Sequence, residues 1–310
     1  MKTILTTLSN AWKDMNSKAM LSTVPIKCEV VDRKKELDIS EITSDFFVFG
    51  TSINGDDTAL LVEKGDIGLD AGYSVNKLPL PDHLFISHHH EDHIGGLPSV
   101  GCRSAEQDKE VNIYIGEDLP EDTYEWIEEF EKGNPINKLK FHYVNEGDIV
   151  TIDDDTKFTF FKTYHSQGSL GMSILKKKGK KWENHLTYTG DIDLKEENVR
   201  KIPQLHETKN LIVESGYFGN DMSDALYDAW EHSSFRTVKN FLESRETPLD
   251  SITYMHLPYA KIFPSLCSKI EREAEGSRAK NVGYVPTCIS GLKNPFKPKL
   301  RKTVEENTDL

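Results

Sequence analysis

The sequence predicts an α/β protein whose functional residues gather at one edge of a β-sheet. Short apolar runs recur along the chain and end in histidine or aspartate, and stretches with helical spacing lie between them. The densest polar cluster, at residues 88–93, directly follows the apolar run 83–87. Because the carboxyl ends of parallel strands meet at one sheet edge, such strand ends predict a shared site.

The N-terminal elements are predicted from apolar spacing. A helix over 3–15 places its apolar residues near helical spacing and is expected to pack on the domain or on a partner. Residues 26–30 alternate as in a strand. Further strands are expected at 46–50, 58–62, 67–69, 83–87 and 111–115, with the polar turn Asn54-Gly55 between the first two.

The second half continues this alternation. A helix over 119–132 directs Trp126, Ile127 and Phe130 inward, with Gly133 as its stop. Strands are expected at 158–164, 186–189, 211–213 and 252–255, and helices at 223–231, 234–243 and 264–275. We expect three segments: an N-terminal amphipathic extension at 1–24, a main domain at 25–290, and a basic-then-acidic tail at 291–310.

Composition predicts a soluble, cytoplasmic protein. No run of about 18 apolar residues predicts a membrane span, and the N-terminus lacks the apolar stretch of a secretory signal. The four cysteines are far apart and form no CxxC pair, which favours a reduced setting. The formal net charge of −13 disfavours long nucleic acid more than a small substrate.

Residues 88–93 spell His-His-His-Glu-Asp-His and predict a metal site. Imidazole and carboxylate groups suit divalent ions such as zinc, and a rigid strand before them holds ligands in place. A histidine run is otherwise a tag or a metal-sticky loop, but this one lies mid-chain with Asp92 between imidazoles. Three more ligand-type residues follow predicted strands: His165, Asp191 and His256.

In this order the residues resemble the metallo-β-lactamase superfamily. The resemblance runs through Gly50-Thr51, Asp70-Ala71-Gly72, the 88–93 turn, His165, Thr189-Gly190-Asp191 and His256. It implies that the main domain is a catalytic αββα sandwich of two mixed β-sheets flanked by helices. It also implies two divalent ions, with zinc as first choice and manganese as the alternative.

The resemblance assigns a role to each residue of the turn. One ion would bind His88, His90 and His165, and the other Asp92, His93 and His256. Asp191 would bridge the two ions, Asp92 would also count among the catalytic residues, and His89 and Glu91 would be spacers.

A second resemblance points to the ribonuclease Z group. Residues 211–214 and 231–234 are similar to its Glu-Ala-Thr and His-Ser-Thr segments. The resemblance implies that His232 is the general acid that protonates the leaving oxygen and that Glu214 orients it. The structural alternative for His232 is a surface residue at a helix N-terminus.

The chain departs from the ribonucleases of this group that process transfer RNA. Only 26 positions separate His165 from Asp191, which leaves no room for their protruding arm. A lysine-rich turn at 176–181 fills this gap, and we interpret it as a solvated hairpin tip rather than a phosphate-binding one. Residues 116–119 also lack the group's Gly-Pro turn. The 65 positions between Asp191 and His256 are too few for the inserted domain of the β-CASP ribonucleases, which share the 88–93 spelling.

Armless relatives of ribonuclease Z include phosphodiesterases that act on cyclic nucleotides, and the chain resembles them in architecture. This resemblance implies a dinuclear metal-dependent phosphodiesterase acting on small, cyclic nucleotides. Its nucleophile would be metal-bound hydroxide, with His232 as general acid. The alternatives are an RNA nuclease of ribonuclease Z type, a metallohydrolase of non-phosphate esters, lactones or thioesters, and a non-enzymatic metal-stabilised protein. The expected partners are a small nucleotide and, from the resemblance, a second copy of the chain, with no membrane.

Overall fold

The computed structural model describes residues 48–62, 65–133, 138–215, 231–256 and 279–284 of the 310-residue chain. Several predicted segments lie outside these ranges: the helix at 3–15, residues 26–30 and 46–47, the helix at 223–231 except its last residue, the helix at 264–275 and the tail at 291–310. These segments, and the division of the chain at residues 24 and 290, stay predictions.

The first sheet contains six strands in chain order. They are β1 (Val48–Ile53), β2 (Asp57–Val62), β3 (Ile67–Leu69), β4 (His83–Ile86), β5 (Val111–Gly116) and β6 (Leu139–Val144). The pairs β1–β2 and β2–β3 are antiparallel, whereas β3–β4, β4–β5 and β5–β6 are parallel. The sheet is therefore mixed, and its parallel strands β3, β4 and β5 end at the same edge.

The second sheet contains seven strands within the described residues, also in chain order. They are β7 (Ile149–Thr151), β8 (Thr156–Lys162), β9 (Leu170–Lys178), β10 (Lys181–Tyr188), β11 (Asn210–Glu214), β12 (Leu249–Met255) and β13 (Ala279–Tyr284). The pairs from β7 to β10 are antiparallel, and those from β10 to β13 are parallel. Strands β8, β10, β11 and β12 therefore end at a common edge.

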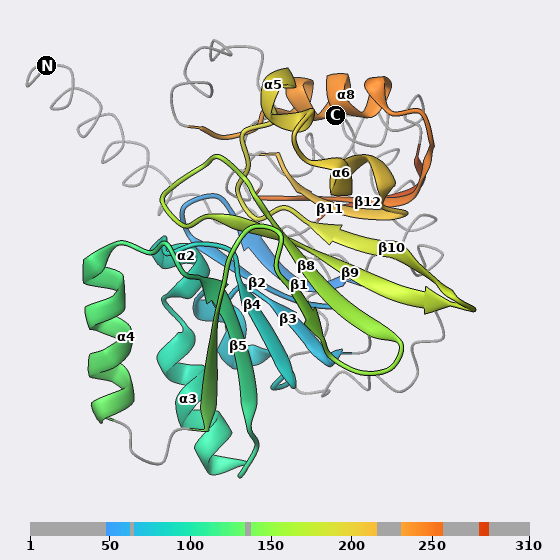
Figure 1. Cartoon of the computed structure of the whole chain (residues 1–310). Helices are drawn as coiled ribbons and strands as arrows, with labels where there is room; N and C mark the ends of the chain where they lie inside the picture. The colour runs from blue at the N-terminus through green and yellow to red at the C-terminus, as the bar shows by residue number, and fades with distance from the viewer. Residues whose placement is uncertain (1–47, 63–64, 134–137, 216–230, 257–278, 285–310) are drawn as a thin grey trace, which may run out of the picture. The chain divides into compact units, whose positions relative to one another are not determined.

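Helices cover the outer face of each sheet (Figure 1). The first sheet packs against η3 (Tyr73–Lys77), α2 (Glu91–Ile94), α3 (Leu97–Glu106) and α4 (Glu121–Gly133). The second packs against α5 (Glu196–Val199), α6 (Pro203–Glu207) and α8 (Phe235–Ser244). A third apolar cluster, with Phe85 from β4 and Phe160 from β8, lies between the sheets. The predicted αββα sandwich is confirmed.

The predicted strands and helices within the described residues are present, with ends shifted by a few positions. Helix α4 buries Ile127 fully and Trp126 and Phe130 partly, as expected from their spacing. Strand β6 was not predicted because it is an edge strand in which Lys140 and His142 are exposed and the alternation is weak. No helix in the described ranges combines the length and apolarity needed to cross a bilayer.

Candidate metal centre and active site

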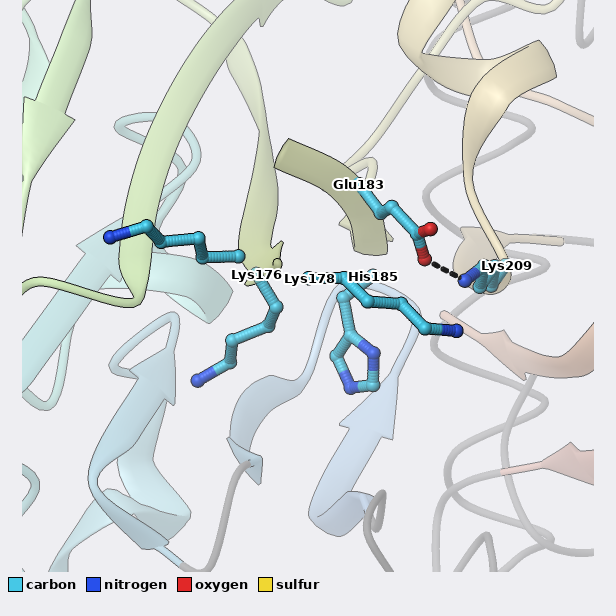
Figure 2. Close-up of a pocket in the computed structure, with 6 residues that line it drawn as sticks. Lys176, Lys178, Glu183, His185 and Lys209 are labelled. Carbon is cyan, nitrogen blue, oxygen red and sulfur yellow. Dashed lines mark hydrogen bonds and ion pairs between the residues drawn. The ribbon is translucent and has the colours of Figure 1, made fainter. Parts of the chain in front are cut away.

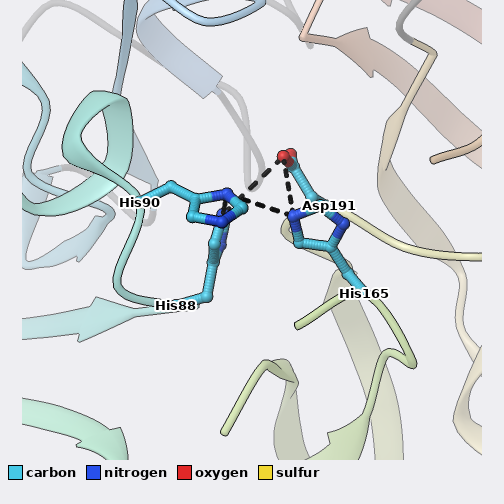
Figure 3. Close-up of side chains that lie close together, drawn as sticks. All are labelled: His88, His90, His165 and Asp191. Atoms are coloured by element: carbon cyan, nitrogen blue, oxygen red, sulfur yellow. Dashed lines mark hydrogen bonds and ion pairs between the residues drawn. The ribbon is translucent and has the colours of Figure 1, made fainter. Parts of the chain in front are cut away.

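The first group of candidate ligands comes from three strand ends and joins His88, His90, His165 and Asp191 (Figure 3). Nδ1 of His90 lies 3.0 Å from Nε2 of His88 and 3.2 Å from Nε2 of His165. Oδ2 of Asp191 lies 3.7 Å from each of these Nε2 atoms. A tetrahedral zinc ion with bonds of about 2.0–2.1 Å separates its ligand atoms by roughly 3.3 Å. The four side chains therefore have the spacing that one such ion requires.

The second group joins Asp92, His93 and His256 on the other side of Asp191. Oδ2 of Asp92 lies 3.5 Å from Nε2 of His93 and 3.3 Å from Nε2 of His256. Asp191 offers Oδ1 at 3.5 Å from Nε2 of His93 and Oδ2 at 3.4 Å from Nε2 of His256. Its carboxylate thus contacts both groups, which is the arrangement expected of a bridging ligand.

The histidines of the first group are neutral. Burial lowers the pKa of His90 to about 4 and that of His165 to about 3. Burial, together with the neighbouring imidazoles, holds the pKa of His88 well below its usual value. A neutral imidazole has a lone pair available for a metal, so these three histidines need to lose no proton to bind an ion.

Carboxylates dominate the second group. Burial disfavours the charged form of His256, but Asp191, Asp92 and Glu214 outweigh it and raise its pKa to about 10. Burial also disfavours the charged form of His93, but Asp191 and Asp70 outweigh it and raise the pKa of His93 well above its usual value. This concentration of buried negative charge favours a cation.

Two buried atoms test whether a metal fits here. Nε2 of His93 and Oδ1 of Asp191 are both buried and have no hydrogen-bond partner among the described atoms. Buried polar atoms are normally paired, because leaving one unpaired costs free energy. The two atoms lie 3.5 Å apart, and Nε2 of His93 lies 3.5 Å from Oδ2 of Asp92. A divalent ion would satisfy them, so the donor set fits metal ions.

His232 and Glu214 form a pair beside both groups. Glu214 is the fully buried last residue of β11, and its Oε1 lies 2.5 Å from Nδ1 of His232. Its Oε2 accepts a hydrogen bond of 2.7 Å from the backbone N–H of Ile192. Burial opposes the charged form of His232, but Glu214 outweighs it and raises the pKa of the ring. His232 Nδ1 also lies 3.7 Å from Asp191.

Ser233 joins the His232 segment to the segment after Asp191. Its hydroxyl donates to the carbonyl of Ile192 at 2.5 Å and accepts from the N–H of Leu194 at 3.1 Å. The next residue, Ser234, caps α8 by accepting a hydrogen bond from the N–H of Thr237. Glu214 therefore holds the ring of His232, and Ser233 and Ser234 hold the backbone that follows it. The structure places all the predicted site residues at one edge of the sandwich.

Asp70, which follows β3, contacts the candidate site, although the sequence predicted no role for it. Its Oδ1 accepts from the N–H of Ser87 at 2.6 Å. Its Oδ2 accepts from the Ser87 hydroxyl at 2.9 Å and from the Tyr188 hydroxyl, and lies 2.6 Å from Nδ1 of His93. Asp70 thereby directs Nε2 of His93 toward the second group. The sequence could have indicated a role for Asp70, because this acid directly follows the predicted strand 67–69, as other candidate site residues follow theirs.

Left-handed backbone turns aim these side chains. Four of the five described non-glycine residues with positive φ lie at the site: Asp70, Tyr164, Glu231 and His256. Tyr164 and Glu231 directly precede His165 and His232, and Gly190, with φ of 60°, precedes Asp191. Such conformations cost roughly 1–3 kcal/mol each in non-glycine residues and persist where the surrounding structure imposes them.

The lysine-rich turn lies elsewhere. It forms the hairpin between β9 and β10, and its tip residues are exposed, as expected of a solvated tip. Figure 2 shows Lys176, Lys178 and His185 around a cavity of about 250 Å³, beside the ion pair of Glu183 with Lys209. The cavity is at the start of β10, whereas Asp191 follows its end, so these lysines are not part of the candidate site.

Comparison with known families identifies the chain. The sequence model of the family described as Anti-Pycsar protein Apyc1 matches residues 51–219, which is more than half of the chain. The protein belongs to this family. The matched segment of this Apyc1-family protein contains Asp70 and all candidate ligands except His256, and His232 also lies beyond it.

Relatives of this Apyc1-family protein include ribonucleases. It is 27% identical to tRNase Z TRZ1 of Arabidopsis thaliana over 230 residues, which cover 73% of this chain and 79% of that protein. The metallo-β-lactamase fold protein YhfI from Bacillus subtilis has a TM-score of 0.59 at 20% identity and covers 80% of this chain and 98% of its own. Zn²⁺-bound PqqB from Methylobacterium extorquens has a TM-score of 0.53 at 10% identity, covering 77% and 97%.

These similarities confirm the superfamily and its ribonuclease Z-like branch. Families of this fold in this branch are metal-dependent phosphodiesterases and ribonucleases. The Apyc1-family protein is therefore a metal-dependent hydrolase, as the sequence predicted.

Proposed function

We propose that this protein is a dinuclear metal-dependent phosphodiesterase that hydrolyses small cyclic nucleotides. The observation that carries the proposal is the His232–Glu214 pair, 2.5 Å apart and in contact with Asp191 between the two ligand groups. An acid in this position serves a reaction with a poor leaving group, such as the ribose oxygen of a phosphodiester. Membership of the Apyc1 family, whose members degrade cyclic nucleotides, supports the substrate class.

His88, His90 and His165 would hold one ion, Asp92, His93 and His256 the other, and Asp191 both. Zinc is the first choice, since imidazole and carboxylate ligands suit it and the similar PqqB binds it, with manganese as the alternative. When bound, two such ions withdraw charge from the phosphoryl oxygens and make a nucleophilic oxygen available near neutral pH.

His232 acts as the general acid in this proposal. Glu214 occupies Nδ1, so the ring presents Nε2, which gives its proton to the leaving oxygen. Glu214 stabilises the protonated ring before transfer and keeps its orientation after it. The Ile192 N–H holds the Glu214 carboxylate, and the Ser233 hydroxyl holds the segment that carries His232 against Ile192. Glu214 and His232 also lie within ligand distance of Asp191 and His256, but their short mutual hydrogen bond favours the acid role.

A hydrolysis panel tests this proposal. Cyclic mononucleotides, cyclic dinucleotides and precursor transfer RNA would be compared with added zinc or manganese. We expect His232→Ala to lower turnover of cyclic nucleotides by about 10²–10⁴-fold with unchanged metal content. His142→Ala, which removes an exposed histidine on β6, is the matched control. Full turnover in His232→Ala would exclude the acid role.

An RNA nuclease is the second candidate, because tRNase Z TRZ1 is a relative across most of the chain. Cleavage of precursor transfer RNA in the same panel, without hydrolysis of cyclic nucleotides, would favour it. A homodimer and a cytoplasmic location also stay proposals, and light scattering coupled to size-exclusion chromatography tests the first of them.

A further inference from the structure

A second cavity opens beside the histidine turn, on the outer side of the first sheet. It has a volume of about 480 Å³ and is lined by Tyr73 from η3, His89 and Glu91 from the turn, and Asp122 and Trp126 from α4. This volume lies within the roughly 300–1,000 Å³ of small-molecule sites. The cavity is therefore large enough for a nucleobase.

The cavity adjoins the candidate ligands. His89 and Glu91 alternate along the chain with His88, His90 and Asp92. The ring of His89 lies 5.0 Å from that of His90 and 6.4 Å from that of His88, centroid to centroid. The residues predicted to be spacers thus line a cavity that begins one position away from the proposed phosphate site.

Aromatic faces surround the cavity. Tyr73 is 50% exposed, and Trp126 stacks on Phe130 with a centroid distance of 6.4 Å. Together with the imidazole of His89 they offer the surfaces on which bases stack. A base that enters this cavity would gain contact area without any rearrangement of α4.

The acidic side chains in the lining are hydrogen-bond acceptors. Glu91 and Asp122 are carboxylates, and Glu91 is oriented by the Tyr73 hydroxyl, which donates to its Oε1. Within the described residues the lining contains no lysine or arginine, so it does not favour a phosphate. Carboxylates accept hydrogen bonds from exocyclic amino groups such as that of cytosine. Uracil offers a carbonyl oxygen at the same ring position.

We propose that this cavity binds the base of the substrate and favours bases with an exocyclic amino group. The inference rests on the proposed function, in which the candidate metal centre takes the cyclic phosphate. The base would stack against Trp126 and donate from its amino group to Asp122 or Glu91.

The test compares cytidine and uridine 3′,5′-cyclic monophosphates, which differ at one ring position, with bis-p-nitrophenyl phosphate, which has no base. The variant is Asp122→Asn, and Glu129→Gln, an exposed change on the same helix, is its matched control. We expect Asp122→Asn to raise KM for the cytidine nucleotide on the order of tenfold relative to the uridine nucleotide. Trp126→Leu should raise KM for both nucleotides relative to bis-p-nitrophenyl phosphate.

Two outcomes distinguish the failures. If both variants hydrolyse both nucleotides with wild-type KM, the base site is wrong and the proposed function stands. If the wild-type protein hydrolyses neither these two nucleotides nor any cyclic nucleotide of the hydrolysis panel, the proposed function fails and the base site fails with it. Because Asp122 is exposed, its variant folds even where loss of Trp126 weakens the packing of α4.

Discussion

Asp70 uses a single buried carboxylate to hold three side chains. Its Oδ2 accepts hydrogen bonds from the hydroxyls of Ser87 and Tyr188 and lies within hydrogen-bond distance of Nδ1 of His93. Partners that hold the second nitrogen of a ligating histidine fix its ring and raise its basicity. We therefore propose that Asp70 positions His93 rather than binding a metal itself.

Asp70→Asn should weaken metal binding by about 10–100-fold, because the amide is a poorer acceptor for the His93 imidazole. Titration of the metal-free variant with zinc, followed by calorimetry, measures the change. Asp193→Asn, also buried but outside both ligand groups, is the control. Equal zinc affinity for wild type and Asp70→Asn would remove the positioning role.

His83 gives the fold a pH dependence of its own. It begins β4, its Nδ1 lies 3.0 Å from the Tyr114 hydroxyl, and burial lowers its pKa from the usual 6.5. The unfolded chain thus binds this proton more tightly than the folded chain. The stability that neutral His83 contributes is present above pH 6.5 and is lost as the pH falls below it.

The free energy of unfolding in urea, measured at pH 7.5 and pH 5, checks this expectation. Wild type should lose more stability on acidification than His83→Gln, whose side chain does not titrate. The two proteins should therefore converge in stability toward pH 5. A parallel decline in both would show that His83 does not contribute.

At the scale of elements, strand ends made the site predictable. His165, Asp191 and His256 are far apart in sequence, but each follows a strand whose carboxyl end reaches the same edge. The left-handed turns at Tyr164 and Glu231 were not predictable, because neither residue type favours positive φ and tertiary contacts impose it. The role of His89 and Glu91 in a cavity was also hidden, since it depends on α4 from a later part of the chain.

Ser234, two residues after His232, caps the N-terminus of α8. Ser234→Ala should lower the free energy of unfolding by about 1 kcal/mol, because the N–H of Thr237 loses its acceptor. Urea denaturation measures this loss. Ser234→Asp keeps an acceptor at the cap and should restore most of it, whereas a loss of equal size in both variants would point to packing instead.

At the scale of the molecule, the candidate ligand groups combine residues from both sheets. His88, His90, Asp92 and His93 follow the first sheet's β4, while His165, Asp191 and His256 follow strands of the second. Bound ions should therefore stabilise the whole fold. With free metal at about 1,000 times its dissociation constant, linkage gives about 4 kcal/mol.

Removal of metal by a chelator should lower the thermal midpoint by up to about 8 °C, because 1 kcal/mol shifts the midpoint by no more than about 2 °C in a chain longer than 250 residues. Differential scanning calorimetry with and without chelator measures it, and added zinc should restore the midpoint. Asp191→Asn, which weakens both groups, should show little response to chelator. An unchanged midpoint in wild type would contradict a metal contribution to stability.

The dependence of KM on salt distinguishes a small substrate from RNA, which a net charge of −13 disfavours. KM for a cyclic mononucleotide should change by less than about threefold between 50 and 200 mM salt, because one phosphodiester releases few counterions. Six to ten phosphate contacts would instead cost about 10³–10⁵-fold in affinity over that range. Steady-state kinetics across this range distinguishes the two substrate classes.

The backbone N–H of His256 donates to the Ser52 hydroxyl at 2.8 Å, across 204 positions of sequence. Synthesis proceeds from the N-terminus, so β1 and the first ligand group are complete long before β12 is made. A nascent chain that stops short of residue 256 lacks both this hydrogen bond and the last ligand. The candidate metal centre therefore cannot be complete until residue 256 has been added to the nascent chain, although the group of His88, His90, His165 and Asp191 is synthesised earlier.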